Sequence, residues 1–332
     1  MNLELFYPEK FNEALLQWFR VAQRPMPWRL TKDPYAIMVS EFMLQQTQVA
    51  TVIPYYLRFM QRFPTLYELA QAPEEEVLTY WAGLGYYSRV RNLLHACQQI
   101  VTDFQGRFPT DYEAIRSLKG VGDYTAGAIR SIAFEQATPA VDGNVMRVFS
   151  RLTGDHQDIG LEKTKQQWRR HILQWMDHQH SSEYTQGLME LGATVCTPKN
   201  PNCERCPVQQ FCWSFAHQQV SHYPVKAKRV KIIVESYDVL WITNGQQQVV
   251  IEQRPATGLL ARQWQLPMQQ ISSSREVSPD YRHQFSHRIW NLYLVSKVQP
   301  DYPLQPHQKW GHFDEIKTSL ITAHQRLLDI GK

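Results

Sequence analysis

The chain has 332 residues, and 35 Lys and Arg residues against 31 Asp and Glu residues give it a formal net charge of +4. Hydrophobic residues make up 43% of it, which excludes a disordered or low-complexity chain. No apolar run reaches the roughly 18 residues of a membrane span, and the first residues lack a secretory signal pattern. We therefore expect a cytoplasmic protein of two or three domains, without a membrane partner. The charge permits nucleic-acid binding but does not demonstrate it.

Helical patterns dominate the chain up to about residue 215. Asp33 followed by Pro34 predicts a capped helix start, and residues 36–46 continue with helical periodicity. Thr65 and Glu68 have the spacing of a capping box before a further helix. These signals predict an all-α region over residues 1–215.

A glycine-containing turn separates two predicted helices around residues 110–130. It contains Gly120, Val121 and Gly122. Such a turn lets backbone N–H groups approach a phosphate closely, and the N-terminus of the following helix favours an anion. The alternative is an ordinary connection between two helices. Taken alone, the motif is therefore only a candidate DNA-backbone contact.

Four of the five cysteines lie close together near the end of the helical region. Cys196, Cys203, Cys206 and Cys212 form the pattern C-x6-C-x2-C-x5-C. In a chain without an export signal, this spacing indicates a metal site rather than disulfides. Four thiolates suit either tetrahedral zinc or a 4Fe–4S cluster. We favour the cluster, because only one C-x2-C pair is present. Cys97 lies in an apolar stretch and is expected to be a buried structural thiol.

From about residue 229 the pattern changes to that of strands. Residues 230–234 and 237–242 are rich in β-branched and aromatic side chains. Asn244-Gly245 predicts a type I′ hairpin before residues 249–251. A helix over residues 319–328 would close an α+β domain spanning 231–332, and residues 216–230 are the expected linker.

One further motif, Asp142-Gly143-Asn144, gains meaning from its context. By itself an aspartate before a glycine predicts a turn or a helix cap. Here it follows the glycine turn and precedes the four-cysteine loop, an order that resembles the endonuclease III superfamily of base-excision DNA glycosylases. Other motifs resemble the adenine DNA glycosylases, the MutY family, over nearly the whole chain: Pro27-Trp28-Arg29, the run 40–49, the run 83–89, the run 189–193 and Phe285-Ser286-His287.

This resemblance implies a fold, a cofactor and a substrate. The helical region would comprise a six-helix barrel with a helix-hairpin-helix motif and an iron–sulfur part over residues 136–215, holding a 4Fe–4S cluster. Residues 231–332 would form a Nudix-like domain that recognises 8-oxoguanine. That domain is expected to bind rather than hydrolyse, because the Nudix catalytic box is missing from the sequence. The substrate would be double-stranded DNA with adenine opposite 8-oxoguanine or guanine, bound by a monomer in a bacterial cytoplasm.

The resemblance also assigns catalytic residues. Hydrolysis of an N-glycosidic bond needs a proton for the departing base and negative charge near the sugar, which two carboxylates in different environments can supply. Glu41, in an apolar predicted helix, would protonate adenine at N7, because burial raises a carboxyl pKa. Asp142 would stabilise the sugar cation, while Asn144 and Tyr124 orient these groups. The alternative for Glu41 is a surface acid without a role.

Recognition residues follow from the same resemblance. Gln46, Thr47 and Tyr86 would contact or wedge into the duplex beside the oxidised guanine. Trp28, Arg29 and Gln186 would surround the extruded adenine. Phe285, Ser286 and His287 would contact 8-oxoguanine, and Gly120, Val121 and Gly122 the DNA backbone.

Tyr124 bears on the type of reaction. Bifunctional members of the superfamily have a lysine at the matching position, which attacks the sugar to form an imine. A tyrosine cannot do so, which predicts a monofunctional glycosylase. Two alternatives remain open: a pyrimidine- or mismatch-specific glycosylase of the same superfamily, and a non-catalytic DNA-binding iron–sulfur protein.

Overall fold

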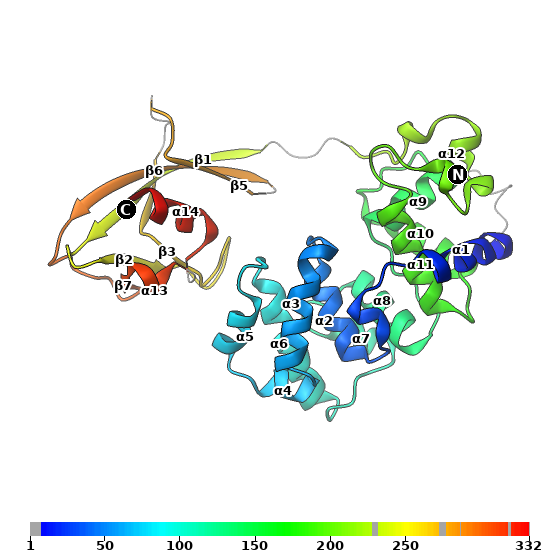
Figure 1. Cartoon of the computed structure of the whole chain (residues 1–332), viewed down its shortest axis with the longest axis horizontal. Helices are drawn as coiled ribbons and strands as arrows, with labels where there is room; N and C mark the ends of the chain where they lie inside the picture. The colour runs from blue at the N-terminus through cyan, green and yellow to red at the C-terminus, as the bar shows by residue number, and fades with distance from the viewer. Residues whose placement is uncertain (1–7, 228–231, 272–276, 286, 318–319, 332) are drawn as a thin grey trace. The chain divides into compact units, whose positions relative to one another are not determined.

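A computed structural model describes residues 8–227, 232–271, 277–285, 287–317 and 320–331. The chain divides into two compact units, Met1–Ala227 and Lys228–Lys332 (Figure 1). Residues 228–230 of the expected linker, and Lys231 at the start of the expected second domain, lie outside the described residues. The hydrophobic clusters of the two units share no residues.

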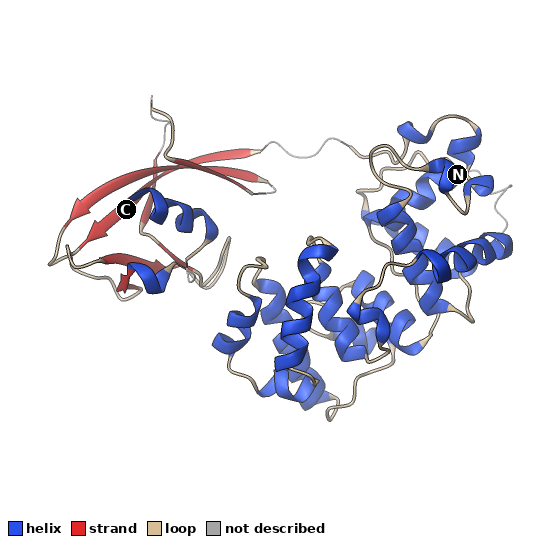
Figure 2. Ribbon diagram, viewed as in Figure 1, coloured by secondary structure: helices blue, strands red, loops and turns tan. Residues whose placement is uncertain are grey.

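The described part of the first unit is helical (Figure 2). Its α-helices are α1 (Pro8–Ala22), α2 (Pro34–Leu44), α3 (Val49–Arg62), α4 (Leu66–Gln71), α5 (Glu74–Trp81), α6 (Ser88–Asp103), α7 (Tyr112–Ser117), α8 (Asp123–Phe134), α9 (Gly143–Thr153), α10 (Glu162–Trp175), α11 (Ser181–Thr194) and α12 (Trp213–Ala216). A 3-10 turn, η1 (Pro27–Leu30), precedes α2. The prediction of a helical region is confirmed.

Two predicted helix starts are confirmed in atomic detail. Asp33 caps α2 by accepting a hydrogen bond from the Tyr35 N–H at 3.1 Å, and Pro34 occupies the first helical position. The capping box at α4 is complete, because Thr65 and Glu68 each accept from the other's backbone N–H. The expected end of α2 at residue 46 is wrong. The helix stops at Leu44, and Gln46 adopts a left-handed backbone conformation with φ of 58°.

Two hydrophobic cores organise the first unit. One is formed largely by α2 to α8 and includes Phe59 and Trp81. The other is formed by α1 and α9 to α11 together with parts of the cysteine loop, and includes Phe149 and Trp168. Helix α8 packs against both α2 and α11, so it joins the two cores. Side chains from both cores can therefore reach one site.

The segment after the cysteine loop packs back onto α9. Tyr223 is buried, and its carbonyl accepts a hydrogen bond from Arg151 Nε at 3.0 Å. The Trp213 ring lies against Gly154 at the end of α9, where a Cβ would approach the ring to 2.3 Å. Of the expected linker over residues 216–230, the part up to Ala227 therefore belongs to the helical unit.

The second unit contains a seven-stranded mixed sheet within its described residues. The strands are β1 (Ile233–Thr243), β2 (Gln248–Gln253), β3 (Trp264–Gln265), β4 (Met268–Ile271), β5 (Tyr281–Gln284), β6 (Arg288–Val298) and β7 (Gln308–His312). The order is β3-β2-β1-β6-β5, with β4 beside β1 and β7 beside β2. Strands β1 and β6 pair in parallel from Ile233↔Arg288 to Thr243↔Val298, and the remaining pairs are antiparallel.

The described residues of the second unit also form α13 (Phe313–Ile316) and α14 (Thr322–Gly331). Leu327 and Leu328 of α14 enter the core together with Val239 and Trp290 of the sheet. A helix-and-sheet domain is therefore confirmed.

Two local predictions in this unit need correction. Strands β1 and β2 do form an antiparallel hairpin, but residues 244–247 connect them, with φ of 79° at Gly245 and 59° at Gln247. This loop is longer than the expected two-residue type I′ turn. The last helix begins at Thr322 rather than residue 319, because Leu320 instead forms an isolated bridge with Trp264.

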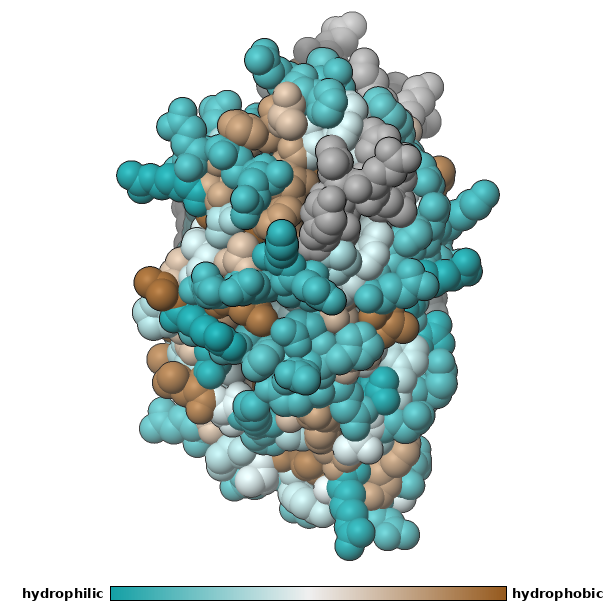
Figure 3. Space-filling view, turned by 90° about the vertical axis from the view of Figure 1, so that its right-hand side faces the viewer, coloured by the Kyte–Doolittle hydropathy of each residue, from teal (hydrophilic) through white to brown (hydrophobic). Residues whose placement is uncertain are grey.

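Among the described residues, no helix has the length and apolar character needed to cross a membrane. On the face shown in Figure 3, hydrophilic residues predominate and hydrophobic ones gather only in small groups.

Candidate active site and iron–sulfur loop

Glu41 is a buried carboxylic acid within an apolar helix. It lies in α2, whose residues from Tyr35 to Met43 are all buried, and is itself 5% exposed. Burial raises the pKa of Glu41 to about 7, because the charged form loses its hydration. Its Oε2 atom has no hydrogen-bond partner among the described residues. The surface-acid alternative is therefore wrong for Glu41, which is placed to hold a proton at neutral pH.

Asp142 occupies a different environment, at the N-terminus of α9. Its Oδ1 accepts from the backbone N–H groups of Asn144 at 2.9 Å and Val145 at 2.8 Å. Its Oδ2 accepts from Asn144 Nδ2 at 2.8 Å. Burial raises the pKa of Asp142, while these donors and the charge of Arg147 oppose that rise. The helix N-terminus also favours a negative charge, so this carboxyl is the better anion of the pair.

Tyr124 lies in the first turn of α8, close to both carboxyls. Its hydroxyl donates to Met189 Sδ at 3.8 Å. Burial raises the Tyr124 pKa far above its usual value, and the charges of Glu41 and Asp142 add to the effect. Tyr124 in turn limits the rise in the Glu41 pKa. The structure thus brings Glu41, Tyr124 and Asp142 into one electrostatic group, with Asn144 attached to Asp142.

Arg147 links this group to the cysteine loop. Its Nη2 atom donates to Asn144 Oδ1 and to the Gly192 carbonyl, each at 2.8 Å. Its Nε atom donates to the Cys196 carbonyl, also at 2.8 Å. Asn144 packs so closely on Gly192 that a Cβ there would approach the Asn144 Cβ to 2.7 Å. Arg147 lies three residues after the Asp142-Gly143-Asn144 motif, and its partners across the fold could not be predicted from the sequence.

Of the residues expected around the adenine, Arg29 belongs to a charged network around the buried Glu190. Trp28 is 7% exposed and meets the Tyr56 ring edge-on, with ring centroids 5.3 Å apart. Arg29 donates to Glu190 Oε2 at 2.8 Å, and Arg24 donates to Glu190 Oε1 at 2.5 Å. Although burial disfavours the carboxylate, these two arginines hold the pKa of Glu190 below its usual value.

Glu190 was missed as a site residue by sequence reasoning. Its side chain is only 1% exposed, and it is the anion that fixes Arg29. The signal lay in the run 189–193, which was matched as a motif without a role for its glutamate. Gln186 lies one turn before Glu190 on α11. Its Nε2 atom donates a hydrogen bond to the Ser182 hydroxyl at 3.1 Å.

The expected wedge residues lie on two loops at the surface. Gln46 is exposed and Thr47 is half-buried, with its N–H donating to the Leu44 carbonyl at 3.2 Å. Tyr86 is 55% exposed, although it has the large aromatic side chain that normally enters a core. Tyr86 shares the left-handed backbone of Gln46, with φ of 49°.

The glycine turn between α7 and α8 is tight. Gly120 has φ of 79°, and a Cβ there would approach the Asn92 Cβ to 2.6 Å, so the position requires glycine. The Val121 N–H donates to the Leu118 carbonyl at 3.0 Å, and the Val121 side chain is buried. The Val121 amide is thus occupied within the turn. Gly122, at the N-cap of α8, has open space around it.

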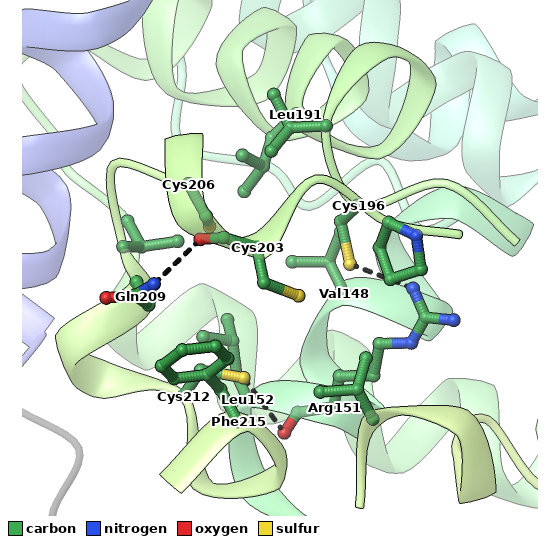
Figure 4. Close-up of a pocket in the computed structure, with 14 residues that line it drawn as sticks. Val148, Arg151, Leu152, Leu191, Cys196, Cys203, Cys206, Gln209, Cys212 and Phe215 are labelled. Carbon is green, nitrogen blue, oxygen red and sulfur yellow. Dashed lines mark hydrogen bonds between the residues drawn. The ribbon is translucent and has the colours of Figure 1, made fainter. Parts of the chain in front are cut away.

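The four clustered cysteines line a single pocket beside α9 and α11. Figure 4 shows the sulfur atoms of Cys196, Cys203 and Cys212 facing a common space next to Val148. The remaining walls are largely apolar, and Arg151 Nη1 donates to Cys196 Sγ at 3.3 Å. Among the described residues, no three His, Cys, Asp or Glu side chains are grouped closely enough to hold a single metal ion. The four soft donors around one space, with an adjacent cation, fit a polynuclear anionic cluster.

The expected 8-oxoguanine residues lie at the β5–β6 connection of the second unit. The Phe285 N–H donates to the Arg288 carbonyl at 2.8 Å, and its ring meets the Trp290 ring edge-on at 4.8 Å. His287 is exposed. Ser286 lies outside the described residues. Phe285 therefore anchors this turn in the domain, while His287 faces solvent.

The fold and the site together define a class of protein. Residues 39–177 match the HhH-GPD superfamily of base excision DNA repair proteins, and residues 196–212 match the iron–sulfur binding domain of endonuclease III. A solved thermostable thymine-DNA glycosylase is 26% identical, with a TM-score of 0.57 over 63% of this chain and 97% of its own. Endonuclease III in a DNA complex, at 20% identity and a TM-score of 0.54, shares the fold over 64% of this chain and 98% of its own.

Sequence relatives are more specific. The adenine DNA glycosylase of Buchnera aphidicola subsp. Schizaphis graminum is 36% identical, over 73% of this chain and 70% of that protein. Those of Rattus norvegicus and Homo sapiens are 37% and 47% identical, over 89% and 61% of this chain. This chain covers only 66% and 39% of those mammalian proteins. The chain belongs to the adenine DNA glycosylase family. The predicted cofactor, a 4Fe–4S cluster, is confirmed by the match over residues 196–212, the segment that contains the four clustered cysteines.

Proposed function

We propose that this protein is a monofunctional DNA glycosylase that hydrolyses the N-glycosidic bond of adenine paired with 8-oxoguanine or guanine. The observation that carries the proposal is the pair of unlike carboxyls. Glu41 is buried with a pKa of about 7, whereas Asp142 is held by donors at a helix N-terminus. Membership of the adenine DNA glycosylase family supports adenine as the base.

The two carboxyls would divide the reaction between them. Glu41 donates its proton to N7 of the extruded adenine, which makes the base a neutral leaving group. Asp142 remains an anion and stabilises the positive charge that develops on the sugar. Water then adds to C1′, and the proton it gives up restores Glu41. Asn144 orients Asp142 through the hydrogen bond from its Nδ2 atom at 2.8 Å. Tyr124 packs beside both carboxyls and helps to orient them.

Tyr124 also supports the monofunctional assignment. A Schiff-base mechanism requires an amine beside C1′, whereas the phenol of Tyr124 stands close to both carboxyls. Lys119, five residues before Tyr124, belongs to the glycine turn. Its backbone N–H donates to Gln99 Oε1 at 2.6 Å. We assign Lys119 to a DNA phosphate rather than to the sugar.

Substrate recognition would use both units. Trp28, Arg29 and Gln186 would contact the extruded adenine, while Gln46, Thr47 and Tyr86 enter the duplex. The amides of the glycine turn near Gly120 and Gly122 would bind the DNA backbone. The second unit would be a Nudix-like domain that reads 8-oxoguanine through the run 285–287. Its support is the family resemblance of that run and the exposed position of His287.

The iron–sulfur cluster would have a structural role. When bound, it crosslinks four thiolates and thereby fixes the fold of residues 196–212. Arg147 and Arg151 of α9 hold this loop through the carbonyls of Cys196 and Thr197, at 2.8 and 2.7 Å. The loop in turn supports the helix whose N-terminus holds Asp142.

The test is single-turnover base excision on a labelled duplex with one adenine opposite 8-oxoguanine, with each sample divided between hot alkali and no alkali. Strand breaks only after alkali are expected, because a monofunctional glycosylase leaves an intact abasic strand. Breaks without alkali would contradict the monofunctional assignment and point to Lys119. If folded, brown protein releases no adenine but releases a mispaired thymine, the adenine assignment fails.

A further inference from the structure

Arg89 is a buried arginine to which the proposed chemistry gives no role. It lies in the first turn of α6 and is 6% exposed. Its Nη1 atom donates to three carbonyls at the C-terminal end of α2, those of Phe42 at 3.0 Å, Met43 at 2.7 Å and Gln45 at 2.6 Å. It therefore binds the end of the helix that carries Glu41.

The same guanidinium also holds a second loop, residues 82–87. Its Nη2 atom donates to the carbonyls of Leu84 at 3.4 Å and Gly85 at 3.2 Å. The guanidinium carbon also lies over two aromatic rings, 5.4 Å from the centroid of Trp81 and 5.3 Å from that of Tyr86. One side chain thus joins α2 to a loop that lies some forty residues later in the chain.

Both segments present an exposed residue in an uncommon conformation. Gln46 follows directly on the α2 carbonyls and has φ of 58°, and Tyr86 has φ of 49°. Such values are uncommon for residues other than glycine and persist where the surrounding structure holds them. Arg89 supplies those surroundings on both sides, since it binds the residue before each of them, Gln45 and Gly85.

The chemistry of arginine suits this position. The last carbonyls of a helix carry partial negative charge and attract a cation. A planar guanidinium presents five N–H donors in a fixed fork and stacks on aromatic rings, whereas a lysine ammonium is compact and has three donors. Burial lowers the pKa of Arg89 to about 10, so the group remains charged at neutral pH.

We infer that Arg89 is a positioning residue for the DNA wedge. It sets Gln46 and Tyr86 at a fixed spacing and ties both to the helix of the acid Glu41. The residues that open the duplex are thereby held in a fixed position relative to the acid that protonates the extruded base. This inference rests on the proposed function, because it assumes that the two exposed residues enter DNA beside the target base.

The variant for the test is Arg89→Lys in the full-length protein with its cluster, and the control is Arg91→Lys. Arg91 lies on the same helix, and its side chain pairs with Glu74 at 2.8 Å instead of binding the carbonyls that Arg89 holds. The first readout is the fluorescence of 2-aminopurine placed beside 8-oxoguanine in a duplex, which rises when the base is unstacked. The second is the single-turnover rate of adenine release at saturating protein.

The fluorescence rise produced by the wild-type protein is expected to fall severalfold in Arg89→Lys and to persist in Arg91→Lys. Adenine release by Arg89→Lys should slow by about tenfold to a hundredfold, the usual effect of misplacing reacting groups by about an ångström. A merely structural role would reduce the fraction of active protein without changing the unstacking signal per bound complex. Equal unstacking by Arg89→Lys and wild type would overturn the inference.

A second variant decides the question if Arg89→Lys fails to fold, as judged by circular dichroism and cluster absorbance. Gly85 has φ of 74° and open space around it. Gly85→Ala therefore strains the backbone of the loop without removing a buried side chain. Reduced unstacking by this variant supports the inference, and normal unstacking overturns it. Since unstacking is measured without excision, a wild-type protein that unstacks DNA but releases no adenine would refute the proposed function alone.

Discussion

Arg147 donates a hydrogen bond to the carbonyl of Cys196, the first cysteine of the iron–sulfur loop, at 2.8 Å. The same guanidinium binds Asn144, whose amide donates to Asp142. Three successive contacts of 2.8 Å therefore connect a cluster ligand to the anion of the proposed active site. All the groups involved lie on α9 or beside it.

This chain of contacts predicts the effect of Arg147→Lys. A lysine keeps the charge but cannot bind Asn144 and Cys196 together. We expect single-turnover adenine release to fall by about tenfold to a hundredfold, as is usual when an outer partner of a functional group is lost. Absorbance near 400 nm should show that the cluster is retained. The control is Arg20→Lys, which alters an exposed ion pair with Glu183 and should leave the rate unchanged.

The pH dependence of catalysis should report Glu41. Its pKa is about 7, so the protonated form that can act as the acid is lost above that pH. We expect the single-turnover rate to be level below about pH 6.5 and to fall about tenfold per pH unit above 8. A rate that increases from pH 7 to pH 9 would show that Glu41 does not supply the proton.

The same shift has a consequence for stability. Burial raises the Glu41 pKa from 4.5 to about 7, so between these values the folded state holds a proton that the unfolded state has lost. Stability therefore declines as pH rises through this window, by up to about 3 kcal/mol at about 1.36 kcal/mol per unit.

Glu41→Gln should remove this cost together with the activity. At pH 8 the variant is expected to be more stable than wild type by up to about 3 kcal/mol, and the difference should vanish near pH 4.5. Urea denaturation at both pH values measures it. Glu76→Gln, which changes an exposed glutamate paired with Arg62, is the control. A Glu41→Gln variant that is less stable than wild type at pH 8 would contradict the raised pKa of the buried Glu41.

Glu190→Gln tests the charged network that holds Arg29. It leaves the buried Arg29 without its anion, and loss of one partner of a buried pair costs about 3–5 kcal/mol. Adenine release should also weaken, because Arg29 loses its fixed position. Glu183→Gln on the same helix breaks only the exposed pair with Arg20 and should cost less than about 1 kcal/mol. Thermal unfolding and single-turnover kinetics compare the two, and equal effects would refute the role given to Glu190.

Local signals explain why much of this structure could be predicted from sequence. The cap at Asp33, the capping box of Thr65 and Glu68, and the cysteine spacing each depend on residues a few positions apart. Glu41 and Asp142 were found because they stand in motifs shared with a family. Such patterns require no knowledge of distant contacts.

Other features depend on partners far away in the chain. Arg89 binds carbonyls more than forty residues earlier, and Glu190 binds arginines more than 160 residues earlier. Backbone carbonyls leave no mark in a sequence, so the role of Arg89 and the early end of α2 could not be predicted. The last helix begins three residues after the predicted start for a related reason. Leu320 forms a β-bridge with Trp264, which is distant in the sequence.

The most direct test of the central claim is the amount of free adenine released in a single turnover from a duplex with adenine opposite 8-oxoguanine. Wild-type protein and Asp142→Asn are compared, with duplex binding measured in parallel. Asparagine still caps a helix, so α9 and the fold should be preserved while the negative charge beside the sugar is lost. We predict full adenine release by wild type and almost none by Asp142→Asn, with nearly equal duplex binding. Release by both proteins, or loss of binding together with release, would contradict it.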